Sequence, residues 1–328
     1  MRQIVIGPND AGQRIDKFMG KRFRTMPTAL IYKFIRKKCV TVAKKKVPEN
    51  YILKEGDVLS FFISDEFFGE APKEEPFRKL VPELTVAYED ENVLIADKPA
   101  GLIVHSDEGE SYNTLINHVL AYLYRKGEYR PEEENCFAPA LCNRIDRNTR
   151  GLVIAAKNAK ALAEMNDMIK NRDLQKRYLA VIHGVPEEKS GELRSKLEKD
   201  EKTNTVRVGS KYGKEAVTRY KLLGTDAAKR LSLVEIELLT GRTHQIRAQF
   251  ASIGHPLLGD GKYAVNKEDR AMGYSYQALC SYSVTFYPQE SAYPLLSYLY
   301  GKNVKASAPE FLDLFPDQIV SRLRKASM

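Results

Sequence analysis

One segment of the chain, residues 65–82, is unsuited to a long helix or a central strand. It holds three prolines, one glycine and many charged residues, and it shows little hydrophobic periodicity. Proline lacks a backbone N–H donor and stiffens the chain, so the segment predicts a semi-stiff linker. The 328 residues are enough for two domains. We therefore expect a small domain over 1–64, a linker over 65–82 and a larger domain over 83–328.

The net charge lies almost entirely in the first expected domain. Residues 1–65 carry 14 Lys+Arg and 6 Asp+Glu, a net of +8 out of the +9 of the whole chain. A small basic module joined to a nearly neutral body is typical of a protein that binds nucleic acid. The alternative is a basic face that serves solubility only.

Composition and cysteine usage exclude several classes of protein. Hydrophobic residues make up 43% of the chain, which supports a packed core. No apolar run is long enough for a transmembrane helix, and the N-terminus lacks a signal-peptide pattern, so we expect a cytoplasmic protein. None of the four cysteines forms a C-x-x-C pair, the five histidines lack metal-ligand spacing, and no phosphate-binding glycine motif follows a strand. We expect neither a metal nor a cofactor.

Hydrophobic periodicity predicts a small α/β domain followed by an α+β domain. In the first domain we expect helices over 13–24 and 29–38, β segments over 40–42 and 57–63, and a lysine turn at 44–46. In the second we expect strands over 84–88, 93–96, 152–156, 178–182, 216–223, 231–240 and 277–287, with helices over 114–125 and 158–170. Helices that interrupt a mostly β chain, together with one half-buried alternating strand, indicate a mixed, largely antiparallel central sheet. Residues 308–326 are expected to form a docking helix.

The most distinctive stretch is 142–157, in which Asp146 stands between Arg144 and Arg147 ahead of a buried strand. In an extended segment Arg144 and Asp146 point to the same side, and a nearby guanidinium favours the ionised carboxylate. An ionised, partly buried aspartate can act as a nucleophile or a base. The alternative is an ordinary Asp–Arg ion pair at a turn.

A second group of polar residues occupies 240–247, directly after the alternating strand. Thr243 is expected to cap a helix over 244–252, and His244 and Arg247 share one face of that helix. Arg247 therefore leaves the helix close to the end of a central strand, where it can pair with a carboxylate from another strand. The alternative is a surface arginine that stabilises the fold.

A third group lies on the expected strand near residue 178. Lys176 and Tyr178 share one strand face, and Arg177 points to the other. A tyrosine can stack on an unpaired base, and its hydroxyl can move a proton where it is suitably placed. The alternative is a tyrosine that belongs to the core.

The first domain resembles the S-four RNA-binding domain, which is named after a ribosomal protein. The resemblance rests on Arg14-Ile15-Asp16-Lys17, the basic second helix, Cys39-Val40-Thr41-Val42 with its basic turn, and Lys54-Glu55-Gly56-Asp57-Val58. It implies that Arg36, Lys44 and Lys45 bind RNA phosphates, which positions RNA without reading its sequence. This chain has Ala43 where the family's turn usually has glycine or asparagine.

The larger domain resembles the RluA family of RNA pseudouridine synthases over roughly 84–287. Four stretches carry the resemblance in the family's order: 86–90 with 97–105, Arg144-Ile145-Asp146-Arg147 through Gly151, Lys176-Arg177-Tyr178, and Gly241-Arg242-Thr243-His244-Gln245-Ile246-Arg247 through Asp260. The fourth stretch is highly specific. The resemblance implies the pseudouridine synthase fold and the isomerisation of uridine in RNA without a cofactor.

The resemblance also assigns roles by position. Asp146 matches the essential aspartate, Tyr178 the tyrosine that stacks on the target base, and Arg247 the basic residue that pairs with the aspartate. Arg144 matches the arginine linked to flipping the target uridine. Substrate binding is implied for Arg144, Arg147, Lys176 and His244, beside Arg36, Lys44 and Lys45 of the first domain.

Three positions depart from the family pattern, and the RNA target is open. Asn143 replaces the usual histidine, Asn148 the usual aspartate, and Arg150 a common serine. The domain order is most similar to that of the ribosomal members, so large-subunit ribosomal RNA is the expected substrate. Transfer RNA is the second expectation, and a non-catalytic RNA-binding factor for ribosome assembly is the alternative from another class. We expect a monomer that needs no protein partner.

Overall fold

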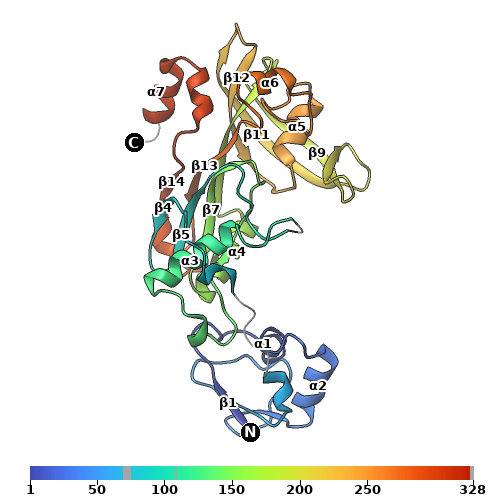
Figure 1. Ribbon diagram of the computed structural model, residues 1–328, viewed down its shortest axis with the longest axis vertical. Helices are drawn as coiled ribbons and strands as arrows, with labels where there is room; N and C mark the ends of the chain where they lie inside the picture. Colours follow the sequence, from blue (N-terminus) through green and yellow to red (C-terminus); the bar gives the residue numbers. More distant parts are fainter. Residues whose placement is uncertain (69–74, 108, 326–328) are drawn as a thin grey trace.

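The computed structural model describes residues 1–68, 75–107 and 109–325, and within them the strands form two sheets (Figure 1). Three strands belong to the N-terminal module, residues 1–68. The larger sheet belongs to the main body, from residue 75 onward. The N-terminal module lies at one end of an elongated molecule, and the C-terminal helix lies near the other end.

The N-terminal module is a small sheet covered by two helices. Its elements are β1 (Arg2–Val5), α1 (Ile15–Arg22), α2 (Thr28–Arg36), β2 (Val40–Val42) and β3 (Val58–Phe61), with the antiparallel order β1-β3-β2. The expected helices and β segments are confirmed, whereas β1 was not expected. Phe18, Met19, Ile31 and Ile35 are buried between helices and sheet, so the amphipathic faces build this core.

The lysine turn between β2 and β3 has a strained backbone. Ala43 and Lys44 have φ values of 47° and 64°, in the left-handed region. The Val42 and Lys45 backbones close the turn with hydrogen bonds of 2.8 and 3.0 Å. Two central residues with positive φ are typical of a tight hairpin turn that usually takes Asn-Gly. Non-glycine residues at both positions cost about 1–2 kcal/mol each.

The linker expected over 65–82 holds local structure at both of its ends. Phe67 and Phe68, in a short 3-10 helix, pack on the core of the N-terminal module. Phe77, in a second 3-10 helix, is buried against Tyr124 and Tyr129 of the main body. Residues 69–74 lie outside the described part. The domain boundaries at 64 and 83 stay a prediction.

Directional hydrogen bonds join the N-terminal module to the main body. Asn9 Nδ2 donates to Glu134 Oε1 at 2.7 Å, and Asn9 Oδ1 accepts from the Ala159 N–H at 3.0 Å. Asn135 Nδ2 donates to Asp10 Oδ2 at 2.7 Å. Ala159 is the first residue of α4 (Ala159–Asn171), so Asn9 satisfies an N–H group that the start of a helix leaves unpaired.

The main body is built on a mixed, largely antiparallel sheet, which confirms the expected α+β class. Its strands are β4 (Val86–Glu89), β5 (Val93–Lys98), β6 (Ala140–Leu141), β7 (Arg150–Ala156), β8 (Leu174–His183), β9 (Ser190–Asp200), β10 (Thr205–Val208), β11 (Lys214–Asp226), β12 (Leu231–Leu238), β13 (Leu279–Phe286) and β14 (Asn303–Lys305). The main path runs β10-β9-β11-β12-β8-β13-β7-β5-β4, with β13 and β7 parallel. Sequence reasoning missed β9 and β10, whose exposed charged residues hide the strand pattern.

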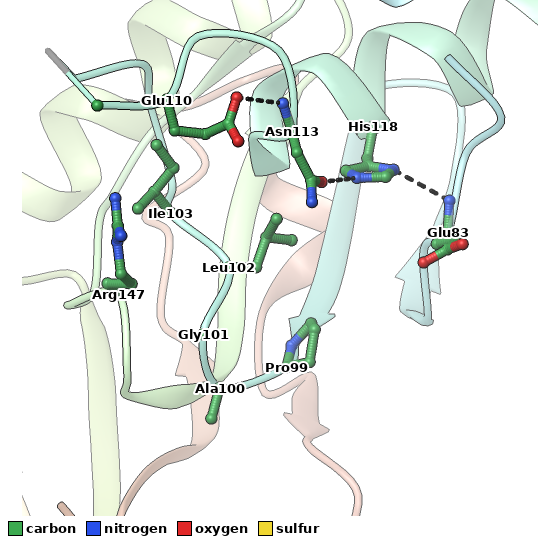
Figure 2. Close-up of a pocket in the computed structure, with 11 residues that line it drawn as sticks. Glu83, Pro99, Ala100, Gly101, Leu102, Ile103, Glu110, Asn113, His118 and Arg147 are labelled. Atoms are coloured by element: carbon green, nitrogen blue, oxygen red, sulfur yellow. Dashed lines mark hydrogen bonds between the residues drawn. The ribbon is translucent and has the colours of Figure 1, made fainter. Parts of the chain in front are cut away.

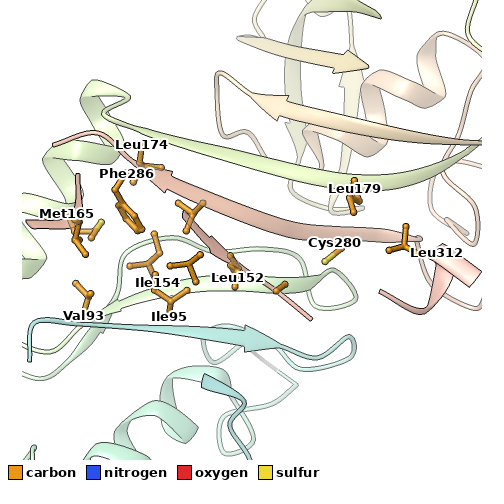
Figure 3. Packing of buried hydrophobic residues seen from close by; sticks show 14 of the residues in the cluster. Val93, Ile95, Leu152, Ile154, Met165, Leu174, Leu179, Cys280, Phe286 and Leu312 are labelled. Atoms are coloured by element: carbon orange, nitrogen blue, oxygen red, sulfur yellow. The ribbon is translucent and has the colours of Figure 1, made fainter. Parts of the chain in front are cut away.

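Hydrophobic cores cover both faces of this sheet. On one face α4 and the C-terminal segment pack on β5, β7, β8 and β13, where Val93, Ile95, Leu152 and Phe286 are buried (Figure 3). On the other face lie α3 (Leu115–Lys126) and α5 (Gln245–Ser252). The sheet is therefore the middle of three layers, and the loops at its strand ends are held from both sides.

The C-terminal segment differs from the single helix expected over 308–326. A 3-10 helix, Glu310–Leu314, precedes α7 (Asp317–Lys325), and Pro316 stands between them. Proline cannot donate the backbone hydrogen bond that a continuous helix needs there. A further short helix, α6 (Lys267–Ala271), follows α5. In the described stretches, no helix combines the length and the apolar composition required to span a membrane.

Gly151 fixes the close approach of β7 to β13. Its φ is +108°, and a Cβ atom there would collide with the backbone of Ser281. We expect Gly151→Ala to lower the free energy of unfolding by roughly 2–5 kcal/mol, because backbone strain and overpacking add. Gly241→Ala is the control, since nothing lies within 4 Å of its Cβ position. Urea unfolding followed by circular dichroism measures both, and equal losses would contradict the steric argument.

Candidate active site

The loop that carries Asp146 lies between β6 and β7 and is held by a buried lysine. Lys98, at the end of β5, donates to the carbonyl oxygens of Pro99, Leu102 and Arg147, each at 2.8 Å. Burial lowers the pKa of Lys98 to about 7, and the charge of Asp146 opposes that shift. Three acceptors match the three N–H bonds of an ammonium group, so the contacts favour the charged form. Lys98 thereby ties two loops together beside Asp146.

Arg247 joins Asp146 to a second, fully buried carboxylate. Its Nε and Nη2 donate to the two oxygens of Asp260, each at 2.7 Å, and its Nη1 donates to Asp146 Oδ2 at 3.1 Å. The Asp260 side chain has no exposed surface, and that of Arg247 is 8% exposed. A bidentate carboxylate fixes the plane of the guanidinium, so the third donor has one direction. The expected pairing of Arg247 with a carboxylate is therefore present.

One oxygen of Asp146 is held and the other is open. Oδ2 accepts from Arg247, whereas among the described residues Oδ1 has no hydrogen-bond partner. The Asp146 side chain is 27% exposed. Asp146 is thus a partly exposed carboxylate beside a fixed cation, and its second oxygen has no hydrogen-bond partner among the described residues.

The helix α5 begins differently from the expectation. Its first residue is Gln245, and the N-cap position belongs to His244 rather than Thr243. His244 has φ 48° and ψ 24°, in the left-handed region, and its side chain makes no capping bond. Gln245 Oε1 instead accepts from the Arg242 N–H at 3.0 Å. The predicted Thr243 cap was wrong because the helix begins at Gln245, which places His244 rather than Thr243 at the N-cap position.

Two buried glutamines fasten α5 to β11, and so place Arg247. Gln245 Nε2 donates to the carbonyl of Val217 at 3.1 Å and to Thr218 Oγ1 at 2.8 Å. Thr218 Oγ1 in turn donates to Gln249 Oε1 at 2.6 Å. A buried amide without a partner would lower the free energy of unfolding. These hydrogen bonds therefore favour one position of α5 on β11.

His244 lies against the same carboxylate. Its Nε2 is 3.9 Å from Asp146 Oδ2, and its Nδ1 is 2.9 Å from the Tyr263 hydroxyl. Burial lowers the pKa of His244 to about 4, with Arg247 adding to the shift and Asp146 opposing it. The imidazole is therefore neutral at neutral pH.

Tyr178 lies on β8 beside the Asp146 loop and is 6% exposed. Burial raises the pKa of Tyr178 to about 12; Ser281 opposes the shift and the charge of Asp146 adds to it. The hydroxyl therefore keeps its proton at neutral pH. Lys176 lies two residues earlier on the same strand, and burial lowers the pKa of its amine. Arg177 points to the opposite face and pairs with Glu235 at 3.0 Å, as strand alternation predicts.

The two arginines that flank Asp146 in sequence do not contact it. Arg144 is exposed. Arg147 pairs with Asp107 at 3.0 Å, and both side chains are half exposed. Arg147 also lines a cavity of about 430 Å³, which Figure 2 shows with Arg147 and Glu83 on opposite sides. The guanidinium on Asp146 thus comes from α5 rather than from the neighbouring residues that the local pattern suggested.

Two of the three departures from the family pattern have local structural roles. Asn143 Oδ1 accepts from the Ile154 N–H at 2.8 Å, which fastens the loop to β7. Arg150 Nη1 pairs with Glu310 of the C-terminal segment at 2.6 Å. In the part of the chain that the structure describes, no contact explains Asn148.

The remaining candidates lie far from Asp146, in the N-terminal module. Lys44 and Lys45 are exposed on the strained turn, and Arg36 is exposed at the end of α2. Figure 1 places this module at the opposite end of the molecule from α5. Among the described residues, no three His, Cys, Asp or Glu side chains gather closely enough to hold a metal ion.

Comparisons with known proteins identify the family. The model of the family described as RNA pseudouridylate synthase matches residues 92–252. An uncharacterized RNA pseudouridine synthase from Mycoplasma genitalium is 32% identical, over 90% of this chain and 92% of its own length. Ribosomal large subunit pseudouridine synthase C from Rickettsia felis is 34% identical, over 78% and 82% of the two chains. This chain belongs to the RNA pseudouridine synthase family.

A solved structure agrees with the fold. The human RNA pseudouridylate synthase domain containing 4 has a TM-score of 0.52 at 22% identity, over 73% of this chain and 92% of that one. The expected family and the pseudouridine synthase fold are thus confirmed. The family model begins at residue 92, so the S-four resemblance of the N-terminal module stays a prediction.

Sequence reasoning assigned no role to three residues that the structure brings to this site. Asp260 and Lys98 lie within the stretches that carried the resemblance, but neither is next to Asp146 in sequence. Tyr263 gave no signal, because an isolated tyrosine in a turn has no characteristic pattern. All three act through contacts that only the folded chain creates.

The buried pair of Arg247 and Asp260 makes a sharp stability prediction. Arg247→Met leaves the Asp260 carboxylate buried without a counter-charge, so we expect the free energy of unfolding to fall by about 3–5 kcal/mol. Arg247→Met combined with Asp260→Asn removes that charge and should recover part of the loss. Urea unfolding of the wild type, both single variants and the double variant measures the coupling. A double variant no more stable than Arg247→Met would contradict the argument.

Proposed function

We propose that this pseudouridine synthase acts on large-subunit ribosomal RNA and that Asp146 initiates the reaction. The observation that carries the role of Asp146 is its environment. Arg247, clamped by Asp260, holds Oδ2, and Oδ1 is open. One oxygen of this carboxylate is held by a cation, and the other has no hydrogen-bond partner in the described part of the chain. Such a carboxylate can attack the ribose as a nucleophile or abstract a proton from it.

The isomerisation needs one bond broken and one formed, without oxidation or hydrolysis. The bond from the ribose to nitrogen 1 of uracil breaks, the base rotates, and the ribose joins carbon 5. The proton on carbon 5 leaves and nitrogen 1 gains one. Asp146 Oδ1 initiates by covalent attack or by proton abstraction from the ribose. Both routes use the same open oxygen.

The target base must leave its stack to reach Asp146. Arg144 is exposed, and we propose that it occupies the space that the flipped uridine leaves in the RNA stack. Tyr178 is proposed to stack on the uracil. A stacked aromatic contact is worth about 1–3 kcal/mol per base. Because the Tyr178 pKa is raised to about 12, its hydroxyl serves as a donor rather than as a ready base. Lys176, Arg147 and His244 complete the proposed substrate contacts.

The N-terminal module is proposed to bind RNA phosphates through Arg36, Lys44 and Lys45. Its surplus of basic residues supports this role, as does the exposure of the lysine turn. Relatives named as ribosomal large subunit pseudouridine synthase C support ribosomal RNA over transfer RNA. We also propose that the protein is a monomer and acts in the cytoplasm without a protein partner.

Replacing the proposed initiating carboxylate should separate binding from chemistry. We expect Asp146→Asn to bind ribosomal RNA as tightly as the wild type and to form no pseudouridine, because the amide is a poor nucleophile and base. Carbodiimide labelling maps pseudouridine in RNA from cells that lack the protein and carry each variant. Asp167→Asn, on the exposed face of α4, is the control. Pseudouridine formation by Asp146→Asn would refute its role, and sites restored only in transfer RNA would refute the substrate.

The lysine turn should determine the affinity for RNA without taking part in the isomerisation. We expect Lys44→Ala with Lys45→Ala to weaken RNA binding and to reduce the salt dependence of the affinity by up to about 2 in slope, because each lysine releases counterions from one phosphate. Lys160→Ala with Lys170→Ala removes the same charge from the exposed face of α4. Binding isotherms at several salt concentrations measure both pairs. An equal change in the two pairs would show a general charge effect.

A further inference from the structure

The polar network around His244 extends to a residue outside the proposed catalytic and substrate-binding set. The Tyr263 hydroxyl accepts from the Val206 N–H of β10 at 2.9 Å and lies 2.9 Å from His244 Nδ1. The two rings meet edge to face with centroids 5.7 Å apart. The Arg247 guanidinium lies 5.3 Å from the centre of the Tyr263 ring. Tyr263 therefore touches both side chains that face Asp146 Oδ2.

The number of protons in this network determines the form of the imidazole. A phenol has one proton to donate, and a backbone N–H can only donate. The Val206 N–H occupies an acceptor site on the Tyr263 oxygen, so the phenol proton is directed to His244 Nδ1. Among the described residues this nitrogen is the one acceptor within reach of the Tyr263 hydroxyl, so pairing the phenol proton requires a lone pair on Nδ1 and leaves the ring proton of a neutral imidazole on Nε2.

We infer that Tyr263 is a positioning residue that fixes His244 as the Nε2–H tautomer, so that an N–H group faces Asp146 Oδ2. The opposite tautomer would set a lone pair against the carboxylate, which is repulsive. The distance of 3.9 Å from Nε2 to Oδ2 is longer than a hydrogen bond, so this contact is an electrostatic one. In the Nε2–H form, the N–H dipole and the carboxylate charge of Asp146 attract each other at this distance.

The backbone of His244 supports a role in the site. A left-handed residue costs about 1–2 kcal/mol, and here the side chain gives no capping bond in return. Instead the backbone turns the imidazole between Tyr263 and Asp146. The charged groups around it are Asp146, Arg247, Lys262 and Asp260, and with burial they leave the ring neutral at neutral pH.

The consequence for the reaction rests on the proposed role of Asp146. Arg247 donates a hydrogen bond to Oδ2, and the His244 Nε2–H adds an electrostatic attraction to the same oxygen, so Oδ1 is left for the substrate. A neutral donor orients the carboxylate without adding a second positive charge beside it. Tyr263 acts through His244 and touches no reacting atom, and its bond to Val206 ties this arrangement to the β9–β10 hairpin.

The tautomer can be measured in the free full-length protein. In protein labelled with 15N-histidine, two-bond proton–nitrogen NMR spectra distinguish protonated from unprotonated ring nitrogens, and His244→Gln assigns the signal by its absence. We expect protonated Nε2 and unprotonated Nδ1 in the wild type at pH 7. Tyr263→Phe should produce a mixture of tautomers, whereas the control Tyr212→Phe, at an 84% exposed side chain, should change nothing. A protonated Nδ1 in the wild type, or an unchanged signal in Tyr263→Phe, would overturn the inference.

Kinetics separate this inference from the proposed function. We expect Tyr263→Phe to lower kcat about tenfold and to change KM for RNA less than kcat, because it loosens a contact to a charged group and removes no RNA-binding side chain. An unchanged kcat would overturn the positioning role. If Asp146→Asn kept its activity while the wild-type tautomer was Nε2–H, the proposed role of Asp146 would fail and the tautomer assignment would stand.

Discussion

The bidentate pair of Arg247 and Asp260 is the interaction on which the site depends. The Asp260 side chain is fully buried and that of Arg247 is 8% exposed, so the guanidinium cannot leave Asp260 without creating an uncompensated buried charge. The pair joins α5 to the turn that follows it, and the remaining donor of Arg247 reaches the loop before β7. Helix α5, the turn after it and the distant Asp146 loop thus meet at one planar group. The rigid fork of arginine achieves this, and lysine could not.

The order of helices and strands was largely predictable, because hydrophobic periodicity survives wherever one face of an element is buried. It failed at β9 and β10, where exposed charged residues alternate with a mixture of apolar, glycine and serine residues, and only Leu197 and Val206 are buried. It also failed at β1, a short edge strand with little burial. At the C-terminus the apolar residues were correctly assigned to packing, but Pro316 divides the segment into two pieces.

For the site, local motifs predicted the chemical groups, and the family resemblance predicted one partner. The motif around Asp146 suggested a guanidinium from its sequence neighbours, whereas the resemblance pointed to Arg247, and the guanidinium that reaches Asp146 is that of Arg247, 101 positions away. Contacts of that kind depend on how strands pair, which no local pattern contains. Ala43 is the opposite case. The sequence marked it as unusual, and the structure explains why, since the turn needs the left-handed conformation that glycine or asparagine adopts at lower cost.

The hydrogen bonds between the N-terminal module and the main body have a geometric consequence. Asn9 and Asn135 specify an orientation through directional bonds. Polar contacts of this kind set a preferred spacing between the lysine turn and Asp146 and can re-form after they open. The lysine turn and Asp146 therefore lie far apart in one molecule, at a preferred separation. On the proposed function, an RNA bound at the turn would present Asp146 with nucleotides a set distance away, so length as well as base sequence would select the uridine.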